Sequence, residues 1–426
     1  MDFPKVLIIS PVSFNQASGG GIFLRNLFND WPTNRISIVH HDPLWDETNS
    51  AVNSFRLTNR ELSFCWPFSN FLSLTSSYSL ATQAPSSFAY PCVKRFLLKP
   101  LQYCVYSSLP ERSELTKQLL QFICNEKPDL IYTILGSNGL MGLISDVLKI
   151  SSVPLCVHIM DDWISSSHTH GIFAYSNRLT MIKRFNHLLS KCDQLLTISD
   201  AMSTEYARRY KLASISLMNS IPEPPNSRLT QETDEIFRLV YIGSVLQNAQ
   251  LASIIDVMRA VQNLSNGICD IQFHVYCNAT GSSLLFPHLG SATFIHPLPT
   301  SDVHFFNLLS SASCLLLPSN FDANSVKHIK FSLPAKLPAY LASRTPILLY
   351  GPPGTAQSDY AIADQWAEVV NQRSQRQLRS KLFSMYNKKT EPSPYVHNAY
   401  SCYLRNHRIK PNTDHFRDIL CSLTHA

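Results

Sequence analysis

The stretch Lys5-Val-Leu-Ile-Ile-Ser10, close to the start of the chain, decides the fold class. Its four consecutive apolar residues are typical of a strand that is buried on both faces of a parallel sheet. A polar loop, a helix-like segment at 22–31 and a second apolar run at 36–40 follow it. A strand, a helix and a strand in this order predict a doubly wound α/β sheet.

The same alternation continues through the first half of the chain. We expect strands at 129–133, 154–159 and 194–199 and helices at 139–150, 174–191 and 201–210. Residues 55–110 break the alternation and are rich in Ser, Phe, Tyr and Leu, so we interpret them as an insertion or a long helical excursion. Their basic and apolar stretch at 94–99 suits either surface packing or a contact with an acceptor or a membrane.

A linker separates two halves of similar design. Residues 221–235 are rich in proline and then polar, which is typical of a linker between domains. The alternation restarts with Arg238-Leu-Val-Tyr-Ile242, and we expect further strands at 270–275, 314–317 and 346–350 and helices at 249–264 and 334–343. The sequence therefore predicts Rossmann-like domains at 1–222 and 236–395, followed by a helical segment at 396–426 that packs back on the first domain.

Length, charge and cysteine usage narrow the class of protein. The chain has 426 residues, enough for two α/β domains, and its formal net charge of +6 suits an anionic partner but is too modest for a nucleic-acid binder. Eleven cysteines without a Cys-x-x-Cys pair indicate free thiols in a reducing compartment rather than a zinc site. Because no signal peptide or long apolar span is visible, we expect a cytoplasmic protein, with a peripheral contact at the inner face of the cell membrane as an option.

A glycine-rich stretch, Ser18-Gly-Gly-Gly-Ile22, lies between the first predicted strand and helix. Glycines allow a backbone to approach a ligand closely, and the amides at a helix start attract anions. The stretch does not match G-x-G-x-x-G, so it is interpreted either as a tight turn or as a substrate loop in which Gly20 and Gly21 contact the ligand.

The stretch His158-Ile-Met-Asp-Asp-Trp163 directly follows a predicted strand. Open α/β sheets bind ligands at the carboxyl ends of their strands, where carboxylates can bind sugar hydroxyls and an indole can stack on a pyranose ring. Asp161, Asp162 and Trp163 are therefore candidates for an acceptor site. The alternatives are that the aspartates cap the next turn while Trp163 packs, and that His158 is a core histidine.

A lysine marks a third candidate site in Ser332-Leu-Pro-Ala-Lys336. We expect Ser332 to cap a helix in which Lys336 occupies the first turn. A lysine there is unfavourable with the helix dipole, so a bound diphosphate is the better explanation of its position than a solvated surface.

The ordered set of these stretches resembles the family 4 type of GT-B glycosyltransferases, enzymes of bacterial surface-polysaccharide and glycolipid assembly. The resemblance rests on the blocks Gly19-Gly-Gly21, Asp161-Asp-Trp163, Leu196-Thr-Ile-Ser199, Leu239-Val-Tyr-Ile-Gly243, Leu316-Leu-Pro-Ser319, Ser332-Leu-Pro-Ala-Lys336, Tyr340-Leu-Ala342 and Pro346-Ile347. They follow the family's order over nearly the whole chain.

The resemblance implies two Rossmann-like domains that face a cleft, with a last helix at 414–424 that crosses back to the N-terminal domain. It places the glycine loop near the donor phosphates, Gly243 and Ser244 at the diphosphate, and Lys336 as the neutralising charge. It also places 294–298, with His296, beside the nucleobase. The expected partners are a nucleotide-diphosphate sugar and a saccharide or lipid-linked acceptor, and we expect neither a cofactor nor a metal.

The implied reaction is a retaining transfer of a hexosyl group. Lys336 with the amides of Gly20 and Gly243 would stabilise the diphosphate charge, and Asp161, Asp162 and His158 would orient the acceptor hydroxyl.

Two departures from the family pattern keep other functions open. The family usually has an Arg and a Lys within the stretch that corresponds to 244–250, and a Glu at the position of Ala339. A catalytically inactive scaffold or partner subunit of this fold is therefore one alternative, and a nucleotide-sugar epimerase is another.

Overall fold

The computed structural model describes residues 3–15, 18–44, 52–66, 68–70, 109–169, 171–224, 236–267, 269–391 and 393–424. The chain divides into unit 1, Met1–Leu217 with Pro411–Ala426, and unit 2, Met218–Lys410. The basic stretch at 94–99 and most of the predicted linker lie outside the described residues.

Unit 1 contains a seven-stranded sheet in which all neighbouring strands are parallel. Its strands, in spatial order, are β3 (Asn53–Arg56), β2 (Ile36–His40), β1 (Val6–Ser10), β6 (Leu130–Thr133), β7 (Leu155–Ile159), β8 (Gln194–Thr197) and β9 (Ser214–Ser216). Its helices include α1 (Gly19–Leu27), α4 (Lys117–Glu126), α5 (Asn138–Ile150), α6 (Trp163–Ser166), α7 (Ala174–Leu189) and α8 (Asp200–Tyr210). A small antiparallel pair, β4 (Leu62–Phe64) and β5 (Glu111–Ser113), accompanies the sheet.

Unit 2 contains a six-stranded sheet, again with parallel neighbours. Its strands, in spatial order, are β12 (Thr293–His296), β11 (Ile271–Tyr276), β10 (Phe237–Ile242), β13 (Cys314–Pro318), β14 (Ile347–Tyr350) and β15 (Glu368–Val370). Its helices include α9 (Leu251–Ser265), α10 (Ala279–Leu285), α11 (Asp302–Ser311), α12 (Ala323–Ile329), α13 (Leu337–Ala342), α14 (Ala356–Asp364), α15 (Gln375–Asn387) and α16 (Pro394–Asn406).

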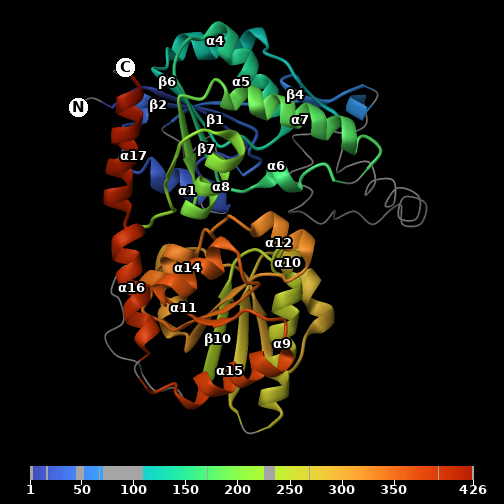
Figure 1. Ribbon diagram of the computed structural model, residues 1–426, viewed down its shortest axis with the longest axis vertical. Helices are drawn as coiled ribbons and strands as arrows, with labels where there is room; N and C mark the ends of the chain where they lie inside the picture. The colour runs from blue at the N-terminus through green and yellow to red at the C-terminus, as the bar shows by residue number, and fades with distance from the viewer. Residues whose placement is uncertain are drawn as a thin grey trace. The chain divides into compact units, whose positions relative to one another are not determined.

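The two faces of the unit 2 sheet carry separate hydrophobic cores. Leu239 and Tyr241 of β10 belong to the core that includes residues of α9 and α15, whereas Val240 and Ile242 belong to the core that includes residues of α11, α13, α14 and α16. Figure 1 shows α9 on one side of this sheet and α11, α14 and α16 on the other. Side chains alternate between the faces of a strand, so an all-apolar strand requires helices on both faces. The doubly wound fold is therefore confirmed.

The strand order reverses direction once in each sheet, between β1 and β6 in unit 1 and between β10 and β13 in unit 2. In open α/β sheets, ligands bind beyond the carboxyl ends of the strands at such a reversal. The loops that follow β1 and β10 are thus the first places to look for a site.

The end of the chain belongs to both units. Ala399, Cys402 and Tyr403 of α16 are buried in the core of unit 2, whereas α17 (Ile409–Thr424) contributes Phe416, whose ring packs on Phe28 of unit 1. The final helix returns to the N-terminal unit, as predicted. The division, however, falls at 410/411, so the residues of 396–410 belong with unit 2 and only the later ones with unit 1.

A buried tyrosine completes the hydrogen bonding of β10. The Ile242 amide donates to the hydroxyl of Tyr340, a fully buried residue of α13, at 3.1 Å. Replacing Tyr340 with Phe should lower the free energy of unfolding by about 1–3 kcal/mol, because it leaves a buried amide without a partner. Urea unfolding of the full chain, followed by its tryptophan fluorescence, to which the buried Trp366 of unit 2 contributes, measures this loss.

Tyr403→Phe is the matched control, since the Tyr403 hydroxyl is buried without a hydrogen-bond partner. We expect this change to leave the free energy of unfolding within about 0.5 kcal/mol of the native value. Equal losses in the two variants would contradict the role assigned to Tyr340.

Candidate functional site

Gly243 and Lys336 meet at the carboxyl end of β10, the central strand at the reversal in unit 2. Gly243 has a φ of +146°, which strongly favours glycine, and a Cβ on it would lie 2.8 Å from Lys336 Nζ. Lys336 Nζ donates a hydrogen bond of 3.0 Å to the Ile242 carbonyl. The absence of a side chain at 243 thus lets the ammonium reach the end of the strand.

The described neighbours of the Lys336 ammonium are two tyrosine rings and a backbone carbonyl. Its Nζ is 3.6 Å from the centre of the Tyr241 ring and 6.0 Å from that of Tyr340. Among the described residues, none of the carboxylates forms an ion pair with it. Part of the residue is exposed to solvent, but burial of the ammonium lowers the pKa of Lys336 well below its ordinary value. A cation held in this way favours an anionic ligand.

The helix start differs from the one expected. Lys336 is the N-cap of α13 rather than a first-turn residue, and α13 has only six residues. Ser332 does not cap the helix; its hydroxyl is buried without a hydrogen-bond partner. The chain contains a second early proline, Pro338, which occupies the first turn in place of Pro334. The positive character of this region therefore depends on the Lys336 ammonium and not on a helix dipole.

The other predicted donor residues lie along the same edge of the sheet. The Ser244 carbonyl accepts a hydrogen bond of 2.5 Å from the Tyr241 hydroxyl, which holds the loop after β10. His296, the last residue of β12, stacks on Tyr276 with a centroid distance of 4.6 Å, and its Nε2 lies 3.0 Å from Nδ1 of His274. His296 is partly exposed and lies two strands away from Gly243.

A buried asparagine that the sequence analysis missed organises the loop after β10. Asn320 follows β13 and is 1% exposed; its amide NH₂ donates to the Gln247 carbonyl at 2.9 Å and its backbone amide donates to the Ala249 carbonyl at 2.7 Å. Its side-chain oxygen accepts from the Ser253 amide at 3.2 Å. The stretch that lacks the family's Arg and Lys is thus held in place by neutral hydrogen bonds. A polar residue just after a strand was the available signal.

The glycines of unit 1 belong to helix α1 and not to a loop before it. The Ser18 hydroxyl caps the helix by accepting from the Gly21 amide at 3.1 Å, so this amide is already used. A Cβ on Gly21 would clash with the Asn15 side chain, and one on Gly20 would lie 3.0 Å from Val12. The glycines therefore allow the first turn of α1 to pack closely against the loop after β1.

The carboxylate of Asp42, after β2, anchors that loop. One oxygen accepts from the Ser13 amide at 2.9 Å, the Ser13 hydroxyl at 2.8 Å and the Asn15 side-chain amide at 2.7 Å. Asn15 in turn accepts from the Ser18 amide at 2.7 Å. Burial alone would raise the pKa of Asp42, but the bonds from Ser13, Leu44 and Asn15 outweigh it and hold the pKa below its usual value. Asp42 was not among the residues expected from the sequence.

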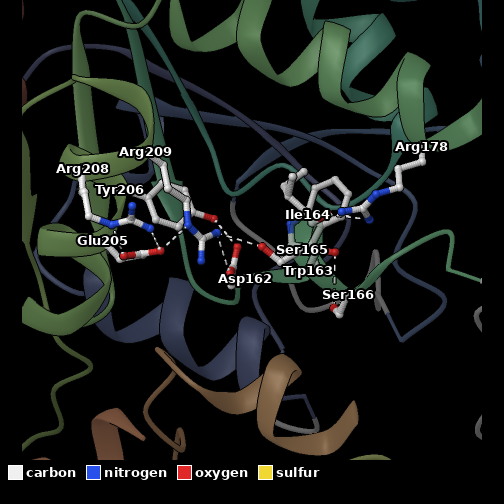
Figure 2. Close-up of polar contacts among 10 residues, drawn as sticks. All are labelled: Asp162, Trp163, Ile164, Ser165, Ser166, Arg178, Glu205, Tyr206, Arg208 and Arg209. Carbon is white, nitrogen blue, oxygen red and sulfur yellow. Dashed lines mark hydrogen bonds and ion pairs between the residues drawn. The ribbon is translucent and has the colours of Figure 1, made fainter. Parts of the chain in front are cut away.

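The two predicted aspartates after β7 have different surroundings. Asp162 is 1% exposed, pairs with Arg209 at 2.9 Å and accepts from the Tyr206 hydroxyl at 3.0 Å (Figure 2). Arg209 also donates to the Ser165 hydroxyl at 2.8 Å. Asp162 occupies the N-cap position of α6, yet its side chain makes no cap bond. Asp161, in contrast, is exposed to solvent, and Trp163 is partly exposed.

His158 has the surroundings of a core histidine, the alternative left open by the sequence. It has no exposed surface, its Nδ1 lies 2.9 Å from the Tyr132 hydroxyl, and its ring packs edge-on against Phe23. Burial lowers the pKa of His158 to about 3, so the imidazole is neutral at pH 7. His158 thus packs within the core next to β6 and α1 and has no exposed surface for a ligand.

Three solved structures share this fold over nearly the whole chain. Anabaena HepE in complex with UDP-glucose is 11% identical, with 98% of this chain and 99% of that chain covered and a TM-score of 0.62. Sucrose-phosphate synthase from Thermosynechococcus elongatus is 11% identical, with coverages of 98% and 99% and a TM-score of 0.64. WaaG, a glycosyltransferase involved in lipopolysaccharide biosynthesis, is 11% identical, with coverages of 97% and 99% and a TM-score of 0.58.

No protein-family model matches the chain, and a sequence comparison with curated proteins found no match. At such low identity the structural likeness establishes the fold, which is the two-domain Rossmann-like arrangement of the GT-B glycosyltransferases.

Replacing Asp42 with Asn should lower the free energy of unfolding by about 2–3 kcal/mol at pH 7, because the buried acceptor of four hydrogen bonds becomes in part a donor. The Asp42 pKa is lowered in the folded state, so this stability is present at neutral pH and is lost as the pH falls through the folded-state pKa. The difference in the free energy of unfolding between the native protein and Asp42→Asn should therefore decrease below about pH 4.

Urea unfolding at pH 7 and at about pH 3, below the ordinary pKa of an aspartate, measures this difference. Asp161→Asn is the control, because Asp161 is exposed and we expect its loss to change the free energy of unfolding by less than about 0.5 kcal/mol. A gap for Asp42→Asn that stays constant with pH would refute the carboxylate's role.

Proposed function

We propose that the protein is a retaining glycosyltransferase of the family 4 type, which transfers a hexosyl group from a nucleotide-diphosphate donor to a saccharide or lipid-linked acceptor. The observation that carries the proposal is the Lys336 ammonium, which lies at the strand end where the sheet order reverses and forms no ion pair with any carboxylate in the described part of the chain. Open α/β sheets bind nucleotides at this kind of position. The surface-polysaccharide or glycolipid pathway follows from the family resemblance of the sequence.

The donor diphosphate would bind at Lys336 and Gly243. The ammonium supplies a positive charge, and the bare Gly243 backbone allows a phosphate to approach closely. As the bond between the sugar and the diphosphate breaks, negative charge develops on the leaving oxygen. A desolvated, prepositioned ammonium stabilises that charge more strongly than a solvated one does.

The nucleobase would extend toward His296. β10 and β12 are separated by two strand spacings, which amounts to about 10 Å and suits the distance between the diphosphate and the base of one nucleotide. The stacked rings of His296 and Tyr276 end at this edge of the sheet and offer a flat aromatic surface. Ala339, at the family's glutamate position, is buried in the core, so the ribose must be held by other groups.

The acceptor would bind in unit 1 through Asp161 and Trp163. Both are accessible to solvent, and they follow β7, whose carboxyl end lies on the ligand edge of the sheet. Asp162 would act indirectly, since its ion pair with Arg209 fixes the start of α6 and thereby places Trp163. The sequence resemblance assigns the Gly20 amide, at the start of α1, to the donor phosphates rather than to the acceptor, while the Gly21 amide donates to its cap, Ser18.

A lipid-linked acceptor would bring the protein to a membrane surface. No helix in the described parts of the chain is long and apolar enough to cross a membrane. A peripheral contact at the inner face of the cell membrane therefore stays a proposal that rests on the sequence.

The competing function is an inactive scaffold, which the missing family residues at 244–250 and 339 favour. Calorimetric titration of UDP-, GDP- and ADP-sugars separates the two, because a transferase must bind at least one of them. Lys336→Met keeps the length of the side chain and removes its charge. We therefore expect it to lower the affinity for the sugar nucleotide at least tenfold, which corresponds to about 1.4 kcal/mol of binding free energy.

Lys388→Met is the control, because Lys388 is an exposed lysine of the same unit. It should leave the affinity unchanged within twofold. If the native protein binds none of the sugar nucleotides, the transferase proposal fails; if Lys336→Met binds as tightly as the native protein, only the role of Lys336 fails.

The lowered pKa of Lys336 predicts a pH dependence of donor binding. The diphosphate favours the protonated lysine, so affinity should fall as the pH rises through the lowered pKa, below the 10.5 of an ordinary lysine. Titrations of a sugar nucleotide at a series of pH values from neutral or below up to the ordinary lysine value of 10.5 measure it. Lys336→Met should lose this dependence, and an equal pH slope in both proteins would contradict the assignment.

A further inference from the structure

Asn219 connects the first residues of unit 2 to the loop that carries Lys336. It is 6% exposed, and its side-chain NH₂ donates a hydrogen bond of 2.7 Å to the carbonyl of Ala335. Its side-chain oxygen accepts from the Ser220 amide at 2.9 Å. Both ends of this buried side chain are therefore satisfied, and one of them holds the residue directly before Lys336.

His407 fixes Asn219 from the other side. Its Nδ1 donates to the Asn219 carbonyl at 2.7 Å, since a carbonyl only accepts, and its Nε2 is then free to accept from the Tyr360 hydroxyl at 3.0 Å. Burial lowers the pKa of His407 to about 4, so the ring is neutral and keeps this tautomer at pH 7. The position of Asn219 is thus set by a chain of hydrogen bonds inside unit 2.

Two backbone hydrogen bonds extend the same contact. The Ile221 amide donates to the His407 carbonyl and the Ile409 amide donates to the Ile221 carbonyl, each at 3.0 Å. Unit 2 begins at Met218 and ends at Lys410, so these bonds join its first and last segments. Through Asn219, both segments are tied to the Lys336 loop.

The Lys336 loop has little regular structure of its own. Residues 332–336 lie between α12 and α13, and Ala335 is exposed. Among the described residues, Asn219 is the one whose side chain, from elsewhere in the chain, forms a hydrogen bond with the segment 332–335. Leu333 packs on the core of unit 2, but without the bond from Asn219 no described side chain would hold the Ala335 carbonyl. The Lys336 ammonium that follows it lies 3.0 Å from the Ile242 carbonyl.

We propose that Asn219 is a positioning residue for donor binding: it holds the Ala335 carbonyl so that the Lys336 ammonium stays at the end of β10. The inference rests on the proposed function, because it assumes that Lys336 binds the diphosphate. Asn219 touches neither the ligand nor the reacting atoms and acts through Lys336 alone. Its effect on donor affinity must therefore vanish when Lys336 has no charge.

A double-mutant cycle tests this dependence. Asn219→Leu, which is similar in size and uncharged, should weaken sugar-nucleotide binding about tenfold by calorimetry. In the Lys336→Met background the same change should alter the affinity by less than twofold. Asn398→Leu is the control, since Asn398 also donates from its side chain to a carbonyl of unit 2, that of Gln365, at 3.1 Å.

The outcomes distinguish this inference from a general structural role. Native affinity in Asn219→Leu, or the same loss in both backgrounds, would overturn the proposal. If Asn219→Leu unfolds, Asn219→Asp replaces it in the cycle, because the aspartate still accepts from the Ser220 amide but cannot donate to Ala335.

A measurement without nucleotide keeps the inference separate from the proposed function. Titration of ¹³Cε-labelled lysine by NMR, with the Lys336 signal assigned from Lys336→Met, reports the pKa of this one side chain. Asn219→Leu should raise that pKa toward the ordinary lysine value, because a released loop exposes the ammonium to water. If the pKa rises although no sugar nucleotide binds the native protein, the positioning role stands and the transferase proposal fails. An unchanged pKa would contradict the positioning role.

Discussion

The contact between the Lys336 ammonium and the Ile242 carbonyl is the interaction on which the ligand edge of unit 2 depends. It requires a glycine at 243, because any Cβ there would meet the ammonium, and it places the charge over the Tyr241 ring. The Tyr241 ring and the Ile242 carbonyl attract the ammonium, but burial still disfavours its charge, and an anionic ligand would offset that cost. The Tyr340 hydroxyl and the Asn219 side chain hold the strand end and the loop on either side of it. The contact explains why the unit keeps a buried charge where its sheet order reverses.

In unit 1, a buried carboxylate, that of Asp42, holds the loop at a strand end. Asp42 accepts hydrogen bonds from Ser13 and Asn15, and the Asn15 side chain accepts one from the Ser18 amide at the start of α1. In both units, buried polar side chains orient backbone groups next to a strand end, so the accessible groups are already in place when a ligand arrives. Asn320 does the same for the loop after β10, without any charge of its own. We expect substitution of such residues to disturb the proposed site although they do not line it.

Most strands that the sequence predicted have apolar residues on both faces, such as β1, β2 and β14, whose residues are all buried. The predicted strand β11 differs, because its residues alternate between buried and half-buried. The strands that the sequence missed include β3, β9 and β12, which lie at sheet edges and have mixed or exposed residues. An edge strand has one neighbour and a partly solvated face, so it needs no apolar run. The candidate site residues also fall into two groups, those that lie together at a strand end and those that are bound to internal partners. Gly243 and Lys336 come together in the structure, whereas His158 and Asp162 are occupied by internal partners.

The sequence by itself determined two doubly wound domains, because continuous apolar strands that alternate with helices can be buried only between two helical layers. It also indicated Lys336 as an unusual lysine, from the residues around it. Only the tertiary structure decided which polar groups remain available to a ligand. The Ile242 carbonyl lies 94 residues from Lys336, Asn219 lies 116 residues from Ala335, and Arg209 lies 47 residues from Asp162. Contacts over such separations depend on which strand ends the packed sheet brings together, and no local pattern in the chain encodes them.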